Sequence, residues 1–308
     1  MNVKLEFTGE RFIPDRIFGD IQLEHFHRYL LASQLVDGKV VLDIACGDGY
    51  GSAILAKHAN KVIGVDIAEE AVNSAKLKHQ AENLEFSKGS CSAIPMGDAS
   101  VDIVVSFETI EHHDEHEQMM MEIKRVLKKD GVLIISSPDK FEYSDKPKYK
   151  NKFHVKELYR HEFLDLLSRY FKYYDLYSQK ISFGSLILRE GSDGPMKSWS
   201  TDDGQQYPCD GVPGGLYLIA VASNYPTSPI YSGIFSTSVS QSDLARERSG
   251  NEQRLEDAVK VLKEAVDGLI IERDSLMDAV KLLKEAVDGL IIERDSLKVT
   301  LKNSSESE

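Results

Sequence analysis

Runs of consecutive apolar residues alternate along most of the chain with segments in which apolar residues recur at helical spacing. Short continuous runs are typical of strands that are buried on both faces of a parallel sheet. Their alternation with helices predicts an α/β fold. Seven segments are predicted as strands: residues 40–42, 61–65, 84–86, 102–107, 132–138, 173–182 and 216–223.

Helices are expected between these strands. In the segment 119–128, Met121, Val126 and Leu127 are expected to point into the core, and Lys129 to Gly131 are expected to end the helix with a turn. The predicted helices are residues 23–35, a helix starting near residue 52, 68–80, 119–128 and 162–170.

The C-terminal part of the chain contains an internal repeat. Residues 257–277 return as residues 278–298 with two changes, so the period is 21 residues, which is three heptads. Leucines recur at d, and valines at a together with Arg273 and Arg294, which predicts a coiled-coil dimer or trimer. A single amphipathic helix folded back on the domain is the alternative. The expected α/β domain, polar linker, coiled coil and frayed tail are residues 1–235, 236–253, 254–302 and 303–308.

Composition narrows the function. The net charge is −13 and no basic stripe offsets it, so a phosphate backbone would be repelled and nucleic acid is not an expected substrate. The three cysteines, Cys46, Cys91 and Cys209, have no metal-site spacing and are expected to be reduced packing residues. We expect a cytoplasmic location, because no apolar run approaches about 18 residues and the N-terminus lacks a signal-peptide layout.

A glycine-rich turn follows the first predicted strand. Gly47, Gly49 and Gly51 lie between this strand and the next helix, and the second strand is followed by Asp66. Glycines let backbone amides approach a ligand, and a carboxylate about 20 residues further on can accept both ribose hydroxyls. This pattern predicts a nucleoside site at the carboxyl edge of the sheet. A glycine turn that binds no cofactor is the alternative.

The segment from Asp43 to Gly49 resembles motif I of the class I S-adenosylmethionine (SAM) dependent methyltransferases, an acid followed by GxGxG. Ala45 stands where the first glycine is expected, and alanine is small enough to keep the turn. The resemblance covers about residues 8–180 in order. It implies a Rossmann-like, doubly wound, mostly parallel sheet of seven strands and SAM as the cofactor. It places these residues in the cofactor site: Asp43, Ala45, Gly47, Gly49, Asp66, Ile67, Ser90, Cys91 and Phe107.

Ser90 departs from the family pattern, and Arg28 is a further candidate for a cofactor contact. Ser90 stands where the family has an acid beside the adenine, and its hydroxyl accepts a hydrogen bond more weakly than a carboxylate. Ordinary loop chemistry is the alternative for Ser90 and Cys91. Arg28, in the first predicted helix, is a candidate to pair with the carboxylate of the methionine part of SAM, with that helix acting as a lid. A solvated helix face is the alternative there.

The strand at 102–107 ends in the sequence ETIEHH. A helix starting near Thr109 would bring Glu108, Glu111 and His112 onto one side. Two carboxylates and an imidazole at a ligand-binding edge suit a general base that deprotonates an acceptor hydroxyl. They also suit a divalent metal that polarises this hydroxyl, and a metal is an open possibility. A hydrogen-bonded helix cap with solvated charges is the third interpretation.

A second resemblance points to an acceptor. Methyltransferases of bacterial polysaccharide (O-antigen type) gene clusters show a TGERF start, a FETIEH word and an Asn-x-Phe-His-x-x-Glu word, which here are residues 8–12, 107–112 and 151–157. Lys152 stands where their proline is usual. This resemblance implies that His154 reaches into the acceptor pocket, with a surface loop as the alternative. The insert at 184–215, with Trp199, is expected to form an acceptor-side flap.

These features predict a cytoplasmic SAM-dependent methyltransferase. The second resemblance implies O-methylation of a sugar hydroxyl in a bacterial surface polysaccharide, with Glu108, His112 and His154 handling the acceptor proton. The coiled coil is expected to mediate self-association, or to space the enzyme from a membrane-associated glycan synthase that would hold it at the inner membrane. Methylation of a small molecule or a protein, and a non-catalytic scaffold, are the alternatives.

Overall fold

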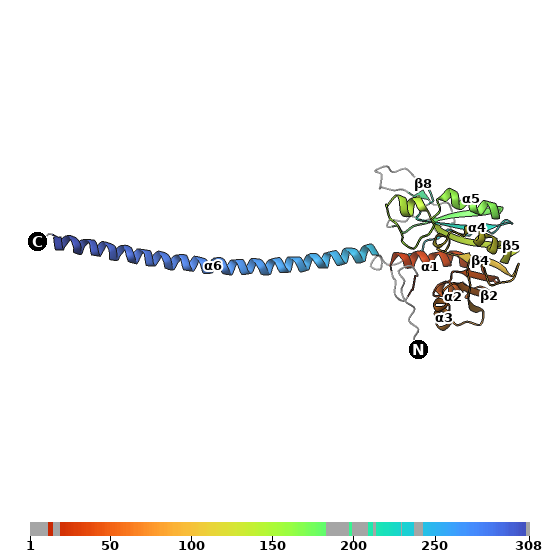
Figure 1. The fold of residues 1–308 in the computed structure, drawn as a ribbon, viewed down its shortest axis with the longest axis horizontal. Coiled ribbons are helices and arrows are strands. Elements are labelled where there is room, and N and C mark those ends of the chain that lie inside the picture. The colour runs from red at the N-terminus through yellow and green to blue at the C-terminus, as the bar shows by residue number, and fades with distance from the viewer. Residues whose placement is uncertain are drawn as a thin grey trace. The chain divides into compact units, whose positions relative to one another are not determined.

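The computed structural model describes residues 12–14, 19–182, 197–198, 209–211, 214–228, 230–236 and 243–305 (Figure 1). The chain divides into two compact units, residues 1–238 and 239–308. The TGERF segment lies outside the described residues except for Phe12, as does Trp199 with most of the expected flap. Each unit is described by itself below.

The first unit is built on a seven-stranded sheet with the order β3-β2-β1-β4-β5-β9-β6. Strands β1 to β5 are parallel, and β9 runs antiparallel to both of its neighbours. This confirms the predicted Rossmann-like, mostly parallel sheet. The strands are β1 Val40–Ile44, β2 Lys61–Asp66, β3 Leu84–Lys88, β4 Val101–Ser106, β5 Leu127–Pro138, β6 Tyr173–Gln179 and β9 Tyr217–Ser223, with a two-residue pair, β7 Lys197–Ser198 and β8 Cys209–Asp210, forming a separate ladder.

Helices cover both faces of the sheet, and the core lies between them (Figure 1). Neighbouring residues of one strand enter opposite layers, since Val41 packs with α1, α2 and α3 whereas Leu42 packs with α4 and α5. Burial on both faces explains why the strands read as continuous apolar runs. The helices are α1 Asp20–Ser33, α2 Tyr50–Leu55, α3 Glu69–Lys78, α4 His116–Val126 and α5 Arg160–Tyr170.

The predicted turn after the fourth helix is wrong. Helix α4 ends at Val126, and residues 127–131 already belong to β5, because Leu127 pairs with Val101 and Lys128 donates to the Asp102 carboxylate at 2.7 Å. Met121 is also exposed and not in the core. It lies off the helical stripe that faces the sheet, which is formed by Met119, Met120, Ile123 and Val126.

The second unit contains one long helix, α6 Asp243–Ser305. It begins inside the segment expected to be a linker, so the helix is longer than the heptad pattern alone predicts. The leucines of the predicted d positions that the structure describes are exposed in the single chain. In the described residues, no helix is both long and apolar enough to cross a bilayer.

Candidate active site

The turn after β1 has an unusual backbone. Ala45, Gly47 and Gly49 have φ values of 60°, 55° and 79°, so all three lie in the left-handed region. Glycine enters this region freely, whereas alanine pays roughly 1–2 kcal/mol for it. Ala45 therefore keeps the turn that the motif requires, at a cost in backbone strain.

Gly51, the next glycine along the chain, packs so closely against Tyr29 of helix α1 that no side chain fits there. A Cβ atom on Gly51 would lie 1.9 Å from Cζ of Tyr29, so any side chain would displace helix α1. The Tyr29 hydroxyl donates to Asp43 Oδ1 at 3.1 Å, and the Ser52 hydroxyl donates to Asp43 Oδ2 at 2.6 Å. Burial raises the pKa of Asp43 to about 7. Asp43 thus ties α1 and α2 to the end of β1.

Asp66 lies at the end of β2, beside the same turn. Its Oδ2 accepts from Gly47 N at 2.8 Å, and its Oδ1 accepts from Ala68 N at 2.9 Å. These bonds fix the carboxylate, and each oxygen can accept a further hydrogen bond. Ile67, the next residue, is 70% exposed although it is a large apolar side chain. A fixed carboxylate and an exposed apolar side chain suit a ribose and an adenine respectively.

Arg28 is almost completely buried, with 1% of its surface exposed. Its Nη1 donates to Gln179 Oε1 at 2.8 Å and lies 3.8 Å from Glu108 Oε1, and its Cζ lies 4.8 Å from the centre of the Tyr217 ring. Among the described residues, its Nε and Nη2 have no hydrogen-bond partner. The alternative of a solvated helix face is therefore wrong at Arg28. It is also wrong at Glu24, which is buried, and this burial raises the pKa of Glu24 to about 7.

Glu108 follows β4 with a φ of 48°, a left-handed value that side chains rarely adopt. Its N–H donates to Ser136 Oγ at 3.0 Å, and the Ser136 hydroxyl donates back to Glu108 Oε1 at 2.7 Å. The helix expected from Thr109 is replaced by a 3₁₀ turn, Ile110–His112. The expected trio is thus divided, because Glu108 contacts Arg28 and Ser136, whereas Glu111 and His112 turn towards another segment.

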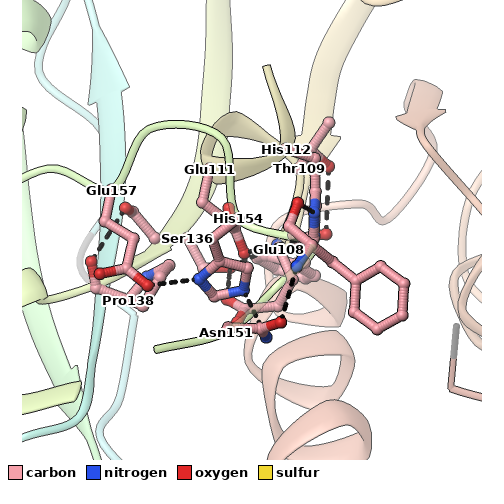
Figure 2. A network of polar contacts seen from close by, with 12 residues as sticks. Glu108, Thr109, Glu111, His112, Ser136, Pro138, Asn151, His154 and Glu157 are labelled. Carbon is pink, nitrogen blue, oxygen red and sulfur yellow. Dashed lines mark hydrogen bonds and ion pairs between the residues drawn. The ribbon is translucent and has the colours of Figure 1, made fainter. Parts of the chain in front are cut away.

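That other segment is the loop carrying His154 (Figure 2). One ligand atom each of Glu111, His112 and His154 lies within 4.8 Å of the other two. The imidazoles of His112 and His154 meet edge to face, with their centres 5.2 Å apart. The structure therefore brings together the motifs at residues 107–112 and 151–157, which are about forty residues apart in sequence. His154 lies beside His112 and Glu111.

The remaining predicted cofactor residues lie elsewhere along the edge. Ser90 Oγ is 2.9 Å from Ser92 Oγ, and Cys91 Sγ is 3.4 Å from Nε2 of His113. Burial raises the pKa of the Cys91 thiol. Phe107 is buried edge-on against Tyr29, with the ring centres 5.1 Å apart. Phe107 thus supports α1 from the end of β4.

Three residues of the site give no signal in the sequence. Gln179 and Tyr217, on β6 and β9, hold Arg28, and Ser136, on β5, holds Glu108. Only the sheet order brings these strand ends together. Tyr29 directly follows Arg28 in the chain, but only the structure shows its hydroxyl on Asp43.

These residues fit SAM, which the motif implies. The two unpartnered donors of the buried Arg28 are suited to a carboxylate, and the carboxylate of Asp66 is suited to a vicinal diol. The left-handed turn brings backbone N–H groups to the same edge of the sheet.

Part of the chain resembles known methyltransferases. Residues 42–135 match the family described as methyltransferase domain. A probable S-adenosylmethionine-dependent methyltransferase of Mycobacterium tuberculosis is 36% identical over 170 residues, which are 53% of this chain and 60% of that protein. One of Mycolicibacterium smegmatis is 35% identical over 171 residues, 53% of this chain and 63% of that protein. The chain thus spans about three fifths of the length of these relatives.

Two more distant matches have other names. The phthiotriol/phenolphthiotriol dimycocerosates methyltransferase of M. tuberculosis is 29% identical over 135 residues, 42% of this chain and 46% of that protein. A solved structure of a SAM-dependent methyltransferase from Thermotoga maritima, described as a possible histamine N-methyltransferase, has a TM-score of 0.48 and 19% identity, and covers 66% of this chain and 90% of that chain.

The sheet order, the glycine turn with Asp66 and the match over residues 42–135 lead to one conclusion. The chain contains a class I SAM-dependent methyltransferase domain.

Proposed function

We propose that the protein methylates a hydroxyl oxygen of its acceptor. The observation that carries this proposal is the position of Glu108. A strained backbone and Ser136 hold its carboxylate at the end of β4, and it is partly exposed beside the buried Arg28. Strain of this kind is found at functional sites, and a carboxylate at this edge of the sheet can serve as a general base.

SAM would supply a methyl group activated by its bond to a positively charged sulfur. Arg28 would bind the carboxylate of the methionine part through Nε and Nη2, and Asp66 would accept from the ribose hydroxyls. Ile67 would cover one face of the adenine. These contacts would position the methyl group beside the ends of β1 and β4, and positioning of this kind is a large part of catalysis in a transfer reaction.

Glu108 would accept the proton of the acceptor hydroxyl as this oxygen takes the methyl group that bound SAM would supply, and the electron pair of the broken carbon–sulfur bond would stay on the sulfur of SAM. Ser136 orients the Glu108 carboxylate through its hydrogen bond to Oε1. His112 and His154 lie edge to face beside this end of the sheet, and the acceptor would lie next to them.

The acceptor we favour is a sugar hydroxyl of a bacterial surface polysaccharide. Its support is the sequence resemblance at residues 107–112 and 151–157, the two segments that lie together at His112 and His154. A lipid hydroxyl is the second candidate. Its support is the relative named as a phthiotriol/phenolphthiotriol dimycocerosates methyltransferase.

Methyl-labelled SAM tests this proposal. The full chain is incubated with the label and, in parallel, with bacterial surface glycan or with a lipid extract, and the products are analysed by mass spectrometry. The proposal predicts label on an oxygen atom of the glycan. It also predicts that Glu108→Gln lowers kcat at least 100-fold, while the exposed Glu85→Gln on β3 has no effect. Label on nitrogen or carbon, or unchanged turnover in Glu108→Gln, would contradict it.

A further inference from the structure

Glu111, His112 and His154 have the composition of a metal site. They offer one carboxylate oxygen and two imidazole nitrogens within 4.8 Å of one another. Glu111 is 1% exposed, so its carboxylate is removed from bulk water. Its Oε1 lies 3.8 Å from His112 Nε2, and a cation bound by both atoms would stabilise the buried carboxylate.

Hydrogen bonds orient both imidazoles for metal binding. His112 Nδ1 lies 3.3 Å from the carbonyl oxygen of Phe153, and His154 Nδ1 lies 2.5 Å from Glu157 Oε1. Because a carbonyl or a carboxylate accepts, each Nδ1 carries the hydrogen and each Nε2 presents a lone pair. Metal-binding histidines characteristically donate their other N–H to such a group, which fixes the tautomer and the ring.

The backbone holds the two segments in register. The carbonyl oxygen of Glu111 accepts from Val155 N at 2.8 Å and from Lys156 N at 3.1 Å. The Tyr143 ring stacks on His154, with the centres 5.3 Å apart. Asn151 Nδ2 lies 3.0 Å from His154 Nε2 and would turn aside when this nitrogen binds an ion. The geometry is therefore largely built before any ion enters.

We propose that Glu111, His112 and His154 bind a divalent first-row transition metal. Two imidazoles and one carboxylate favour Mn²⁺, Fe²⁺, Co²⁺ or Zn²⁺ over the oxygen-preferring Mg²⁺ and Ca²⁺. Three protein ligands leave positions open for an acceptor hydroxyl. Such an ion lowers the pKa of the hydroxyl, whose proton passes to Glu108. This last role rests on the proposed function, but the site itself does not.

Titration with Co²⁺ tests the site without donor or acceptor. The full chain is treated with a chelator, dialysed and titrated, with the visible absorption of Co²⁺ and calorimetry as readouts. We expect one ion per chain, at least tenfold weaker binding in His112→Ala and in His154→Ala, and no change in His161→Ala, an exposed histidine of α5. No binding, or equal binding in all variants, would overturn the site.

Methyl transfer is measured on the same samples. Loss of transfer on chelation and its recovery with added metal are expected. If the ion binds but chelation leaves transfer unchanged, the role in activating the hydroxyl is wrong although the site stands. If no transfer occurs in any sample while Co²⁺ still binds, the proposed function fails and the metal site does not.

Helix α6 supports a second, independent inference. In the single chain, its a and d positions leave an apolar stripe exposed over the whole repeat. Valine at a with leucine at d favours a parallel two-stranded coiled coil. The exposed members of the stripe include Val259, Leu262, Val266, Leu269, Leu276, Val280, Leu283, Val287 and Leu290.

Charged residues beside the apolar stripe favour one orientation and one register of the paired helices. Arg273 and Arg294 occupy a positions, and each directly follows a glutamate at g, Glu272 or Glu293. In a parallel, in-register pair, each arginine lies next to the glutamate of the other chain, whereas an antiparallel pair would set it against a d-position leucine. A slip by one 21-residue repeat would leave one repeat of each chain uncovered.

We infer that α6 pairs in parallel and in register with α6 of a second copy of this chain. Sedimentation of the full chain should give a dimer, and Leu276→Cys should form an intermolecular disulfide upon oxidation. The double variant Glu272→Lys with Glu293→Lys should weaken the dimer at least tenfold. A monomer at micromolar concentration, a trimer, or no disulfide in Leu276→Cys would overturn the inference.

Discussion

The Ser136 hydroxyl contacts both the backbone and the side chain of Glu108. It accepts from Glu108 N at 3.0 Å and donates to Glu108 Oε1 at 2.7 Å. One buried hydroxyl thus compensates for a left-handed φ of 48° and orients the carboxylate that we propose as the base.

Ser136→Ala should therefore lower turnover more than binding. We expect kcat to fall about 10- to 100-fold, while the affinity for SAM changes less than threefold, because Glu108 keeps its charge but loses its orientation. Ser100→Ala, at a surface turn, is the control. Equal losses in kcat and in SAM affinity would show that Ser136 acts on the cofactor site.

Arg28→Lys tests the contact with the methionine carboxylate. Lysine keeps the charge but loses the planar pair of donors, so the affinity for SAM should fall about 10- to 100-fold. Calorimetry with SAM and with its decarboxylated analogue isolates the contact. The unaltered protein should prefer SAM, and the variant should lose most of this preference. An unchanged preference would mean that Arg28 binds another group. Arg169→Lys, on the exposed face of α5, is the control.

Ala45→Gly should stabilise the protein. Glycine relieves the left-handed strain at Ala45 but costs chain entropy, so the free energy of unfolding should rise by about 1 kcal/mol. Ala53→Gly, in helix α2, should lower it by about 1 kcal/mol. Chemical denaturation measures both. A loss of stability in Ala45→Gly would mean that the alanine methyl contributes packing that outweighs the strain.

Glu24→Gln should change the pH dependence of stability. Burial raises the pKa of Glu24 from 4.5 to about 7, so between these pH values the unfolded state releases a proton that the folded state keeps. Stability from this group is therefore present below pH 4.5 and falls as pH rises to 7, by up to roughly 3 kcal/mol at 1.4 kcal/mol per unit.

The variant cannot titrate at this position. The melting temperature of the variant, relative to that of the unaltered protein, should rise between pH 4.5 and 7. Above pH 7 the difference between the two melting temperatures should stay constant. The pKa of Asp43 is also raised, so Asp43 too makes stability fall as pH rises. Both proteins contain Asp43, so this contribution cancels in the difference between them. Parallel melting curves across this range would contradict the prediction.

The sequence predicts the sheet well because its strands are buried on both faces and read as apolar runs. It also predicts that Asp66 lies at the end of the second strand near the glycine turn, where its carboxylate accepts from Gly47 N. It does not predict the conformation at Glu108, because nothing in the residue type encodes a left-handed φ there. The helix expected from Thr109 is wrong for this reason.

Contacts between distant strands are the other part that the sequence does not contain. Arg28 meets Gln179 across 151 residues, and Glu108 meets Ser136 across 28. The first pair depends on the sheet order, in which β9 lies between β5 and β6, and the second depends on the pairing of β4 with β5. The loop after β5 places His154 beside His112. In the sequence, only the resemblance of the motif at residues 151–157 points to a role for His154.

The central claim is that the glycine turn after β1, together with the end of β2, binds SAM. Calorimetric titration with SAM tests it most directly. Ile67→Ser removes an apolar side chain that is 70% exposed, so the fold should be unaffected, and Leu77→Ser, on α3 at 59% exposure, is the matched control. We predict one SAM per chain, about tenfold weaker binding in Ile67→Ser and unchanged binding in Leu77→Ser. No heat from the unaltered protein, or equal affinity in all three proteins, would contradict the account.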